Sequence, residues 1–326
     1  MPKIRSPELG ENMDSISGKI AIVTGGGTGM GRELCLYLAR RGCHVALCDL
    51  SDENMAATAE LCKAAAPDGT RITTHQCDVS DEAQVVGFRN QVMASHETEY
   101  INLLFNNAGI GGGGSFVTDD RASWELTFDV CWWGVYFCAR AFLPMLIASE
   151  EAILVNTSSI NGFWASVGPS SPHTSYSAAK FAVKGFTEAL MTDLRLNAPH
   201  VSAALVMPGH IGTSIAINSG KAHGPIDTTV VRKRLAERGL PVDQWSDDDI
   251  EQMVADRAVS FRDDAPTTAA EAAEFIIEQA LAGEWRILVG TDAVAIDEFV
   301  RADPHSAYEP EFIDRVHAAG HLNVFG

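Results

Sequence analysis

A short apolar run, a glycine-rich loop and a helical pattern follow one another near the start of the chain. Residues 20–24 are Ile-Ala-Ile-Val-Thr, a β-branched run that predicts a buried strand. Residues 25–31 are Gly-Gly-Gly-Thr-Gly-Met-Gly, and a helical pattern continues through Leu34 and Leu38. Glycines let the backbone approach a ligand closely, and the unbonded N–H groups at a helix start favour an anion. The chain is therefore restricted to folds in which a strand–loop–helix unit cradles a phosphate group.

The second predicted strand, 44–48, ends at an acidic residue. Asp49 follows Gly31 by 18 residues. At that distance an acid can accept hydrogen bonds from a ribose 2′-hydroxyl and repel a 2′-phosphate. Alternatively, Asp49 is a turn or cap residue, because Ser51-Asp52-Glu53 is typical of a helix start. Within a βαβ unit, the combination predicts a dinucleotide site that prefers NAD.

Strands and helices continue to alternate through most of the chain. Helical patterns cover about 81–95, 121–148, with a kink expected at Pro144, and the stretch that begins around Tyr176. Such alternation produces a parallel sheet covered on both faces, so we expect a Rossmann-like, doubly wound α/β fold. Further strands are predicted at 71–76, 101–105, 152–156, 201–206 and 285–289.

Residues that could bind a ligand or take part in catalysis follow the ends of these strands. In open parallel sheets, ligands bind beyond the carboxyl ends of the strands. One edge of the sheet is therefore expected to hold the functional site. The residues that this edge gathers, besides the glycine loop, are Asp49, Asp78, Asn107, Ser159 and Pro208.

The chain is predicted to form a single domain with two appendages. Residues 1–17 are polar and lack periodicity, so we expect an N-terminal extension. The dinucleotide-binding domain covers 18–290, and about 214–266 form a helical insertion that acts as a substrate lid. The tail, 291–326, mixes aromatic and acidic residues and is expected to pack over the pocket or on a neighbouring subunit.

The charge and the cysteines exclude several classes of function. A net charge of −19 argues against nucleic acid or an anionic membrane as the main partner. No stretch reaches about 18 uninterrupted apolar residues, and the first residues lack the apolar run of a secretory signal. No standard metal-ligand spacing occurs, so no metal is expected. Seven cysteines without a C-x-x-C pair indicate reduced thiols in a cytoplasmic protein.

The stretch Ser175-Tyr176-Ser177-Ala178-Ala179-Lys180 places a phenol and an ammonium on one helix face. Tyr176 and Lys180 are four residues apart, which is one helical turn. A neighbouring ammonium favours the phenolate and lowers the pKa of the tyrosine. A tyrosine adjusted in this way can exchange a proton with a substrate oxygen. For an isolated pair of this spacing, a surface tyrosine and lysine would be the better interpretation. The motifs in the rest of the chain must therefore show whether the pair is catalytic.

Together these motifs resemble the classical short-chain dehydrogenase/reductase family. They occur in the family's order over about residues 18–215, and the glycine spacing is similar to that of the classical branch. The motifs are T-G-x-x-x-G-x-G (Thr24, Gly25, Gly29, Gly31), Asp49, Asp78-Val79, N-N-A-G (Asn106 to Gly109), Ser159, Y-x-x-x-K (Tyr176, Lys180) and Pro208-Gly209 with Thr213.

The resemblance implies a role for each matching residue. Tyr176 is the acid/base, Lys180 lowers its pKa and binds the nicotinamide ribose, and Ser159 polarises the substrate oxygen. Ser158 competes with Ser159, which we prefer because the second serine of this pair usually has that role. The implied NAD-binding residues are Gly25, Gly27, Thr28, Gly29, Met30 and Gly31 at the pyrophosphate, Asp49 at the adenine ribose, Asp78 and Val79 at the adenine, Asn107, Ala108 and Gly109 near the ribose, Ile211 and Thr213 at the carboxamide, and Tyr176 and Lys180.

Two features depart from the family pattern. Cys131 stands where an asparagine is expected, within Asp129-Val130-Cys131-Trp132-Trp133-Gly134-Val135. That asparagine is thought to hold a water that links the lysine to solvent, and a thiol is a poor substitute. Alternatively, Cys131 is merely a small buried residue. The spacing of 17 residues between Ser159 and Tyr176 is also longer than usual, so we expect a loop at 167–173 on the pocket rim.

The segment after the sixth strand is expected to determine the substrate. It is rich in apolar residues, and with Phe163 and Trp164 it predicts a roomy, apolar pocket, while His210 either touches the substrate or is a rim histidine without a chemical role. We expect NAD-dependent interconversion of a secondary alcohol and a ketone on a bulky hydrophobic skeleton of steroid, terpenoid or aryl type. The resemblance also implies a homotetramer or homodimer formed through the helix at 121–148 and the helix of Tyr176. The alternative is a non-catalytic NAD-binding regulator, which only Cys131 favours.

Overall fold

The computed structural model describes residues 13, 15–168, 171–237 and 239–321. Most of the predicted N-terminal extension lies outside these residues. Met13 and Ile16 are buried in the main core, so the end of the extension belongs to the packed domain.

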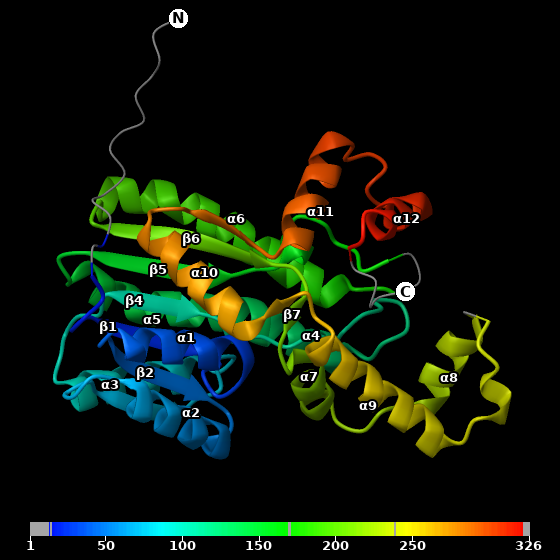
Figure 1. Cartoon of the computed structure of the whole chain (residues 1–326), viewed down its shortest axis with the longest axis horizontal. Helices are drawn as coiled ribbons and strands as arrows, with labels where there is room; N and C mark the ends of the chain where they lie inside the picture. Colours follow the sequence, from blue (N-terminus) through cyan, green and yellow to red (C-terminus); the bar gives the residue numbers. More distant parts are fainter. Residues whose placement is uncertain (1–12, 14, 169–170, 238, 322–326) are drawn as a thin grey trace, which may run out of the picture.

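Seven parallel strands form one sheet in the order β3-β2-β1-β4-β5-β6-β9 (Figure 1). Every predicted strand is present, with ends that differ by at most two residues. The strand order reverses between β1 and β4, which is the switch point where such sheets bind ligands. The strands are β1 Ile20–Thr24, β2 His44–Asp49, β3 Ile72–Gln76, β4 Leu103–Asn106, β5 Ala152–Thr157, β6 Val201–Pro208 and β9 Arg286–Val289.

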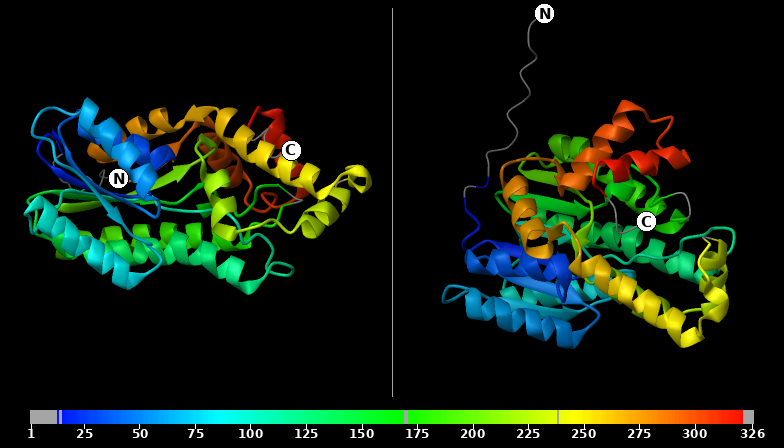
Figure 2. Two further views of the ribbon diagram at one scale, coloured as in Figure 1. Left: turned by 90° about the horizontal axis from the view of Figure 1, so that it is seen from below. Right: turned by 45° about the vertical axis from the view of Figure 1, so that its right-hand side comes forward.

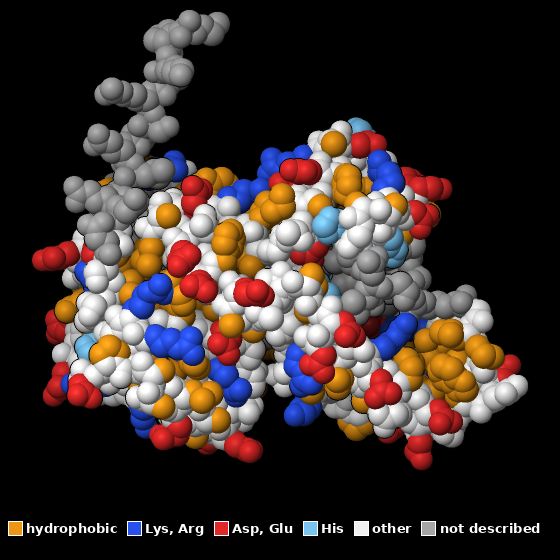
Figure 3. All heavy atoms as spheres, in the orientation of Figure 1, with side chains coloured by type: hydrophobic (Ala, Val, Ile, Leu, Met, Phe, Trp, Pro, Cys, Tyr) orange, Lys and Arg blue, Asp and Glu red, His pale blue; other side chains and the backbone are white. Residues whose placement is uncertain are grey.

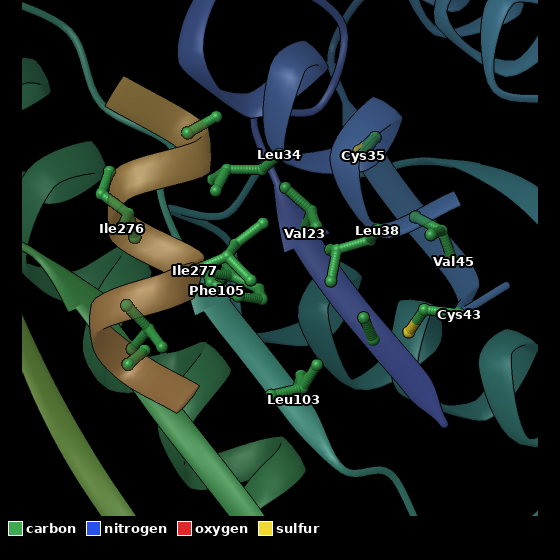
Figure 4. Close-up of a cluster of buried hydrophobic side chains, with 14 of the residues drawn as sticks. Val23, Leu34, Cys35, Leu38, Cys43, Val45, Leu103, Phe105, Ile276 and Ile277 are labelled. Carbon is green, nitrogen blue, oxygen red and sulfur yellow. The ribbon is translucent and has the colours of Figure 1, made fainter. Parts of the chain in front are cut away.

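Helices cover both faces of the sheet, as Figure 2 shows. One face packs against α1 (Gly29–Arg40), α2 (Asp52–Ala65) and α10 (Ala269–Leu281). In Figure 4, Leu34 and Leu38 of α1 and Ile277 of α10 meet the strands of this core. The opposite face packs against α3 (Glu82–His96), α5 (Gly134–Ile147) and α6 (Thr174–Asn197). Burial on both faces explains why the central strands are apolar runs without alternation.

The helix predicted at 121–148 contains an irregular turn. It consists of α4 (Arg121–Phe128), a π-helical turn at Asp129–Trp133 and α5. Helix α5 continues through Pro144 to Ile147, so the irregularity lies well before the proline at which a kink was expected. By length and composition alone, Arg121–Ile147 could span a membrane. Half of its most apolar window is buried in the protein, as for a core helix.

The insertion between β6 and β9 is helical, as predicted. It begins after β7 (Ile211–Gly212) and ends at β8 (Thr267–Thr268), and these two short strands pair with each other. The base of the insertion is therefore closed, while its helices project from the sheet (Figure 1). The helices are α7 Ile215–His223, α8 Thr228–Glu237, a 3-10 turn Val242–Gln244 and α9 Asp247–Asp263.

The C-terminal tail forms α11 (Thr291–Ala302) and α12 (Pro310–Ala318). Trp164, Phe312 and Val316 belong to a small core between this tail and the segment after β5. The indole N–H of Trp164 donates to the Ala307 carbonyl over 2.7 Å. The tail thus packs on its own chain, against the segment that follows β5.

Candidate active site

Hydrogen bonds join the ends of β1 and β4 at the switch point. The Thr24 hydroxyl accepts the N–H groups of Asn107 and Ala108, each over 3.0 Å. The Asn107 side chain donates to the Thr24 carbonyl over 3.0 Å. This network fixes the predicted Asn107–Gly109 segment directly beside the glycine loop.

The glycine loop fits a phosphate group. Gly25 has a φ of +65°, and a Cβ on Gly31 would overlap the Gly25 carbonyl oxygen, so both positions require glycine. Helix α1 has no side-chain cap from Thr28 and no acid in its first turn. In contrast, Ser51 caps α2 and Asp81 caps α3. The N–H groups at the start of α1 therefore keep their capacity for an anionic ligand.

Asp49 lies under the glycine loop. Its Oδ2 accepts the N–H of Gly27 over 3.0 Å, and its Oδ1 accepts the N–H of Ser51 over 3.1 Å. The cap of α2 is Ser51, whose hydroxyl accepts the N–H of Asn54. Asp49 therefore ends β2 and holds the turn to α2 through Ser51, and each of its oxygens has a further lone pair for a ribose hydroxyl.

The other predicted cofactor residues lie along the same edge of the sheet. Asp78 accepts hydrogen bonds from the backbone and hydroxyl of Ser80, over 2.9 and 2.6 Å. Val79 is buried against Gly134 of α5. Thr213 follows β7 and lies against Gly29, where a Cβ would come within 3.0 Å of the Thr213 Cβ. Ile211 is buried in β7, and Met30 packs against the main core.

The two serines after β5 have different partners. The Ser158 hydroxyl donates to the Lys180 carbonyl over 2.7 Å and thereby fixes α6 to the sheet. Ser159 caps the 3-10 turn Ile160–Gly162, and its hydroxyl accepts the N–H of Asn161 over 3.1 Å. The Ser159 side chain also interacts with the Tyr176 phenol and lowers its pKa. These contacts favour Ser159 over Ser158 as the serine that faces a substrate.

Lys180 is buried beside the tyrosine. Its ammonium donates to the Thr157 carbonyl over 2.9 Å and lies 5.3 Å from the centre of the Tyr176 ring. A Cβ on Gly109 would lie 3.5 Å from the same nitrogen, so the ammonium also borders the Asn107–Gly109 segment. The two remaining N–H donors of the ammonium are available for ribose hydroxyls.

Opposing influences act on the pKa of Tyr176. Burial raises this pKa above its ordinary value, while the charge of Lys180 and the interaction with Ser159 lower it. Burial has the largest effect, so the net shift is upward. The sequence predicted the lowering by Lys180 but not the burial that outweighs it.

Cys131 lies in the π-helical turn and is fully buried. Its thiol donates to the Ile110 carbonyl over 3.2 Å. A Cβ on Gly109 would lie 3.6 Å from this sulfur and 3.5 Å from the Lys180 nitrogen, so Cys131 and Lys180 both border Gly109. Cys131 is therefore a buried residue next to the Tyr–Lys pair, with its donor bonded to the backbone.

Two residues expected at the pocket lie elsewhere. Trp164 is buried under the tail, where it packs on Phe312 with ring centres 5.3 Å apart. His210 is buried between the sheet and the insertion, and its Nε2 donates to the Phe261 carbonyl over 2.6 Å. Both expectations are wrong, because the sequence did not reveal that the tail and α9 would cover these side chains.

His173 was missed as a site residue. The sequence placed it in the rim loop, of which 169–170 lie outside the described residues. Its ring lies 4.9 Å from the ring of Tyr176. Burial lowers the pKa of His173 to about 4, so its imidazole is neutral near pH 7. Its position three residues before Tyr176, at the residue that directly precedes α6, was the available signal.

A switch-point glycine loop beside Tyr176, with the buried Ser159 and Lys180 next to it, defines a dinucleotide-dependent oxidoreductase. The chain belongs to the short-chain dehydrogenase family, whose model, described as short chain dehydrogenase, matches residues 19–224. The fold and the classical family membership expected from the sequence are thus confirmed.

Known relatives support this assignment over almost the whole chain. The oxidoreductase SadH of Mycobacterium tuberculosis is 32% identical over 289 residues, 89% of this chain and 92% of the relative. A Burkholderia phymatum short-chain dehydrogenase/reductase in complex with NAD is 27% identical, with a TM-score of 0.73 over 91% of this chain and 98% of that one. A metagenomic short-chain oxidoreductase in complex with NADP is 31% identical, with a TM-score of 0.53 over 60% of this chain and 83% of that one.

Proposed function

We propose that the protein is an NAD-dependent dehydrogenase that interconverts a secondary alcohol and a ketone on a bulky hydrophobic substrate. The observation that carries this proposal is the buried Lys180 ammonium beside Tyr176, with Ser159 and the glycine loop on the same edge of the sheet. Such a group supplies a proton donor and acceptor next to a site for a nicotinamide.

Asp49 supports NAD over NADP. Its carboxylate lies under Gly27, and the neighbouring Thr28 and Leu50 carry no charge. The Arg32 guanidinium donates to the Gly27 carbonyl over 2.6 Å and to Thr58 over 3.0 Å. A 2′-phosphate would therefore meet a carboxylate rather than an unengaged cation. Tighter binding of NADP than of NAD would contradict this proposal.

NAD would supply the hydride acceptor, and the side chains of the protein would control the proton. In the oxidation direction, the Tyr176 oxygen accepts the proton of the substrate hydroxyl. The charge of Lys180 stabilises the phenolate, and the Ser159 hydroxyl donates to the substrate oxygen. In the reduction direction, Tyr176 returns the proton to that oxygen.

Aromatic side chains near the start of α6 support a hydrophobic substrate. Trp124 and Phe128 of α4 stack with ring centres 5.4 Å apart, and Phe116 packs edge-on against Trp124. The Trp124 indole donates to the hydroxyl of Thr174, two residues before Tyr176. Apolar side chains also gather over α8, where Val230 is exposed (Figure 3). Turnover of small polar polyols alone would exclude this substrate class.

The first test is NAD reduction, followed by NADH absorbance, with a panel of bulky secondary alcohols. The Tyr176→Phe variant keeps the ring but loses the acid/base, so turnover should fall by about 10²- to 10⁴-fold. Calorimetry should show that this variant still binds NAD. If wild type binds NAD but converts neither alcohols nor ketones, the regulator alternative that Cys131 favours replaces the dehydrogenase proposal.

The seven cysteines are all buried free thiols. This supports our proposal of a reducing, cytoplasmic location. Measurement of the free thiols in protein purified from its native cells tests it, and a disulfide among the seven would contradict it.

A further inference from the structure

Asp292 is a buried carboxylate outside the Ser–Tyr–Lys group. It lies in the first turn of α11, beyond the end of β9, and is only 1% exposed. Its Oδ2 accepts the N–H of His210 over 2.6 Å. Its Oδ1 has no hydrogen-bond partner among the described residues. Burying a charged group with so few partners is costly, so its presence requires an explanation.

The surrounding backbone leaves space for this carboxylate. A Cβ on Gly209 would overlap the Asp292 carboxylate, and a Cβ on Gly290 would come within 2.5 Å of Oδ1. Gly290 also has a φ of +97°, which favours glycine. The Gly209 N–H donates to the Val289 carbonyl over 2.9 Å. The ends of β6 and β9 are therefore shaped around Asp292, and the N-terminus of α11 favours its negative charge.

The partner of Asp292 lies at the start of the corner that leads to the glycine loop. His210 is followed by β7 and by Thr213, whose N–H donates to the Ile211 carbonyl over 2.8 Å. Thr213 then lies against Gly29 at the start of α1. A hydrogen bond from the carboxylate to the His210 N–H thus fixes a segment that reaches the cofactor site within three residues.

The same histidine connects this corner to the insertion. The His210 ring packs on Phe261 of α9 with ring centres 4.4 Å apart. Its Nε2 carries a proton, because the Phe261 carbonyl to which it bonds can only accept. Asp292, His210 and Phe261 therefore link α11, the end of β6 and α9 in one continuous contact.

We propose that Asp292 is a positioning residue that anchors the His210–Thr213 corner and thereby sets the affinity for the nicotinamide end of NAD. This inference rests on the proposed function for the identity of the cofactor. The carboxylate anchors the corner by accepting the His210 backbone N–H. This hydrogen bond is strong because a charged acceptor binds an N–H group more strongly than a neutral one.

The test compares NAD affinity of the full-length wild type with Asp292→Asn and Asp292→Ala by calorimetry. We expect the dissociation constant to rise about threefold in D292N, which keeps a neutral acceptor, and about tenfold or more in D292A. Hydrogen exchange followed by mass spectrometry should show faster exchange in peptides that cover 209–213 in both variants.

Asp297 provides a matched control on the same helix. It is 7% exposed and accepts hydrogen bonds from Arg286 and Arg301. Asp297→Ala should lower the melting temperature but leave NAD affinity unchanged. Equal loss of NAD affinity in D297A and D292A would show general destabilisation and overturn the proposal.

The remaining outcomes are also decisive. If D292A does not fold, D292N alone tests the proposal. An NAD affinity and an exchange rate at 209–213 equal to those of the wild type would then show that Asp292 does not anchor the corner. If the wild type itself does not bind NAD, the proposed cofactor fails, while the exchange measurement still tests the anchor. Unchanged exchange at 209–213 in D292A would then reject the role of Asp292 independently.

Discussion

At the scale of single residues, Tyr176 is held between burial, which raises its pKa, and Lys180, which lowers it. Replacing Lys180 with methionine keeps the buried alkyl chain and removes the charge. The Tyr176 pKa should then rise by about one unit or more, so the increase of alcohol oxidation with pH, which requires the phenolate, moves to higher pH. Because the chain has five tyrosines, NMR of tyrosine-labelled protein can follow the phenol directly.

Lys184 provides the control for this measurement. It lies one turn further along α6 and pairs with Glu188 over 2.9 Å at the partly exposed surface. Lys184→Met should leave the Tyr176 titration unchanged. If both methionine variants, or neither, shifted the titration, the specific effect of the Lys180 charge would be refuted.

A second residue-scale prediction concerns two histidines joined by Thr73. The Thr73 hydroxyl bridges His75 and His96, over 2.8 and 2.9 Å, and His75 bonds to Gln91. Burial, with smaller contributions from Arg71, His44 and His75, lowers the pKa of His96 to about 4. Since the unfolded chain protonates near pH 6.5, the contribution of His96 to stability is present above that pH and lost as the pH falls toward 4.

Urea unfolding at pH 7 and pH 4.5 measures this contribution. The loss of unfolding free energy between the two pH values should be about 2 kcal/mol smaller in His96→Gln than in the wild type. Carboxylates and other histidines that protonate over the same range contribute to both proteins, so the difference isolates His96. Parallel pH curves for the two proteins would contradict the lowered pKa.

At the scale of elements, two glycines inside helices have opposite environments. A Cβ on Gly31 in α1 would overlap the Gly25 carbonyl, whereas a Cβ on Gly87 in α3 would meet nothing within 4 Å. Gly31→Ala should therefore cost about 1–3 kcal/mol and weaken NAD binding. Gly87→Ala should stabilise the protein by about 0.4–1 kcal/mol, because it lowers the entropy of the unfolded chain. Thermal unfolding measures the stability of both variants, and calorimetry measures their NAD affinity. Equal changes in the two variants would refute the close packing of Gly31 against the glycine loop.

The elements themselves were largely predictable, because each has a local signature. The strands are apolar runs, and the glycine loop and the Tyr176–Lys180 spacing are patterns within a few residues. The π-helical turn at Asp129–Trp133 and the burial of Trp164 were not predictable. Both depend on contacts with distant segments, such as the bond from Trp164 to Ala307.

The anchoring of the insertion was also beyond sequence analysis. His223 of α7 contacts Gly111, Ser123 and Thr127, which lie about a hundred residues earlier. No local pattern indicates such a contact. The same limit applies to His210, whose role depends on Asp292 and Phe261 rather than on its neighbours in the chain.

At the scale of the whole molecule, two neighbouring helical segments present aromatic side chains to the outside. Trp133 at the end of the π-helical turn is 39% exposed, and Phe181 of α6 is 40% exposed. The rings of Trp132, Tyr136 and Phe186 continue this cluster. We propose that this face, on the two helices expected from the sequence to mediate assembly, forms a two-fold interface with a second copy of the chain.

Trp133→Glu tests this interface, because it places a charge among aromatic rings. The dimer dissociation constant should rise about 30-fold or more, as expected for a central tryptophan, and sedimentation equilibrium measures it. Leu61→Glu is the control, since Leu61 is 47% exposed on α2, on the opposite side of the sheet. A wild type that sediments as a monomer at micromolar concentration, or equal dissociation by both variants, would exclude this face. A loss of assembly in W133E alone would mean that the helix carrying Cys131 also carries the contact between subunits.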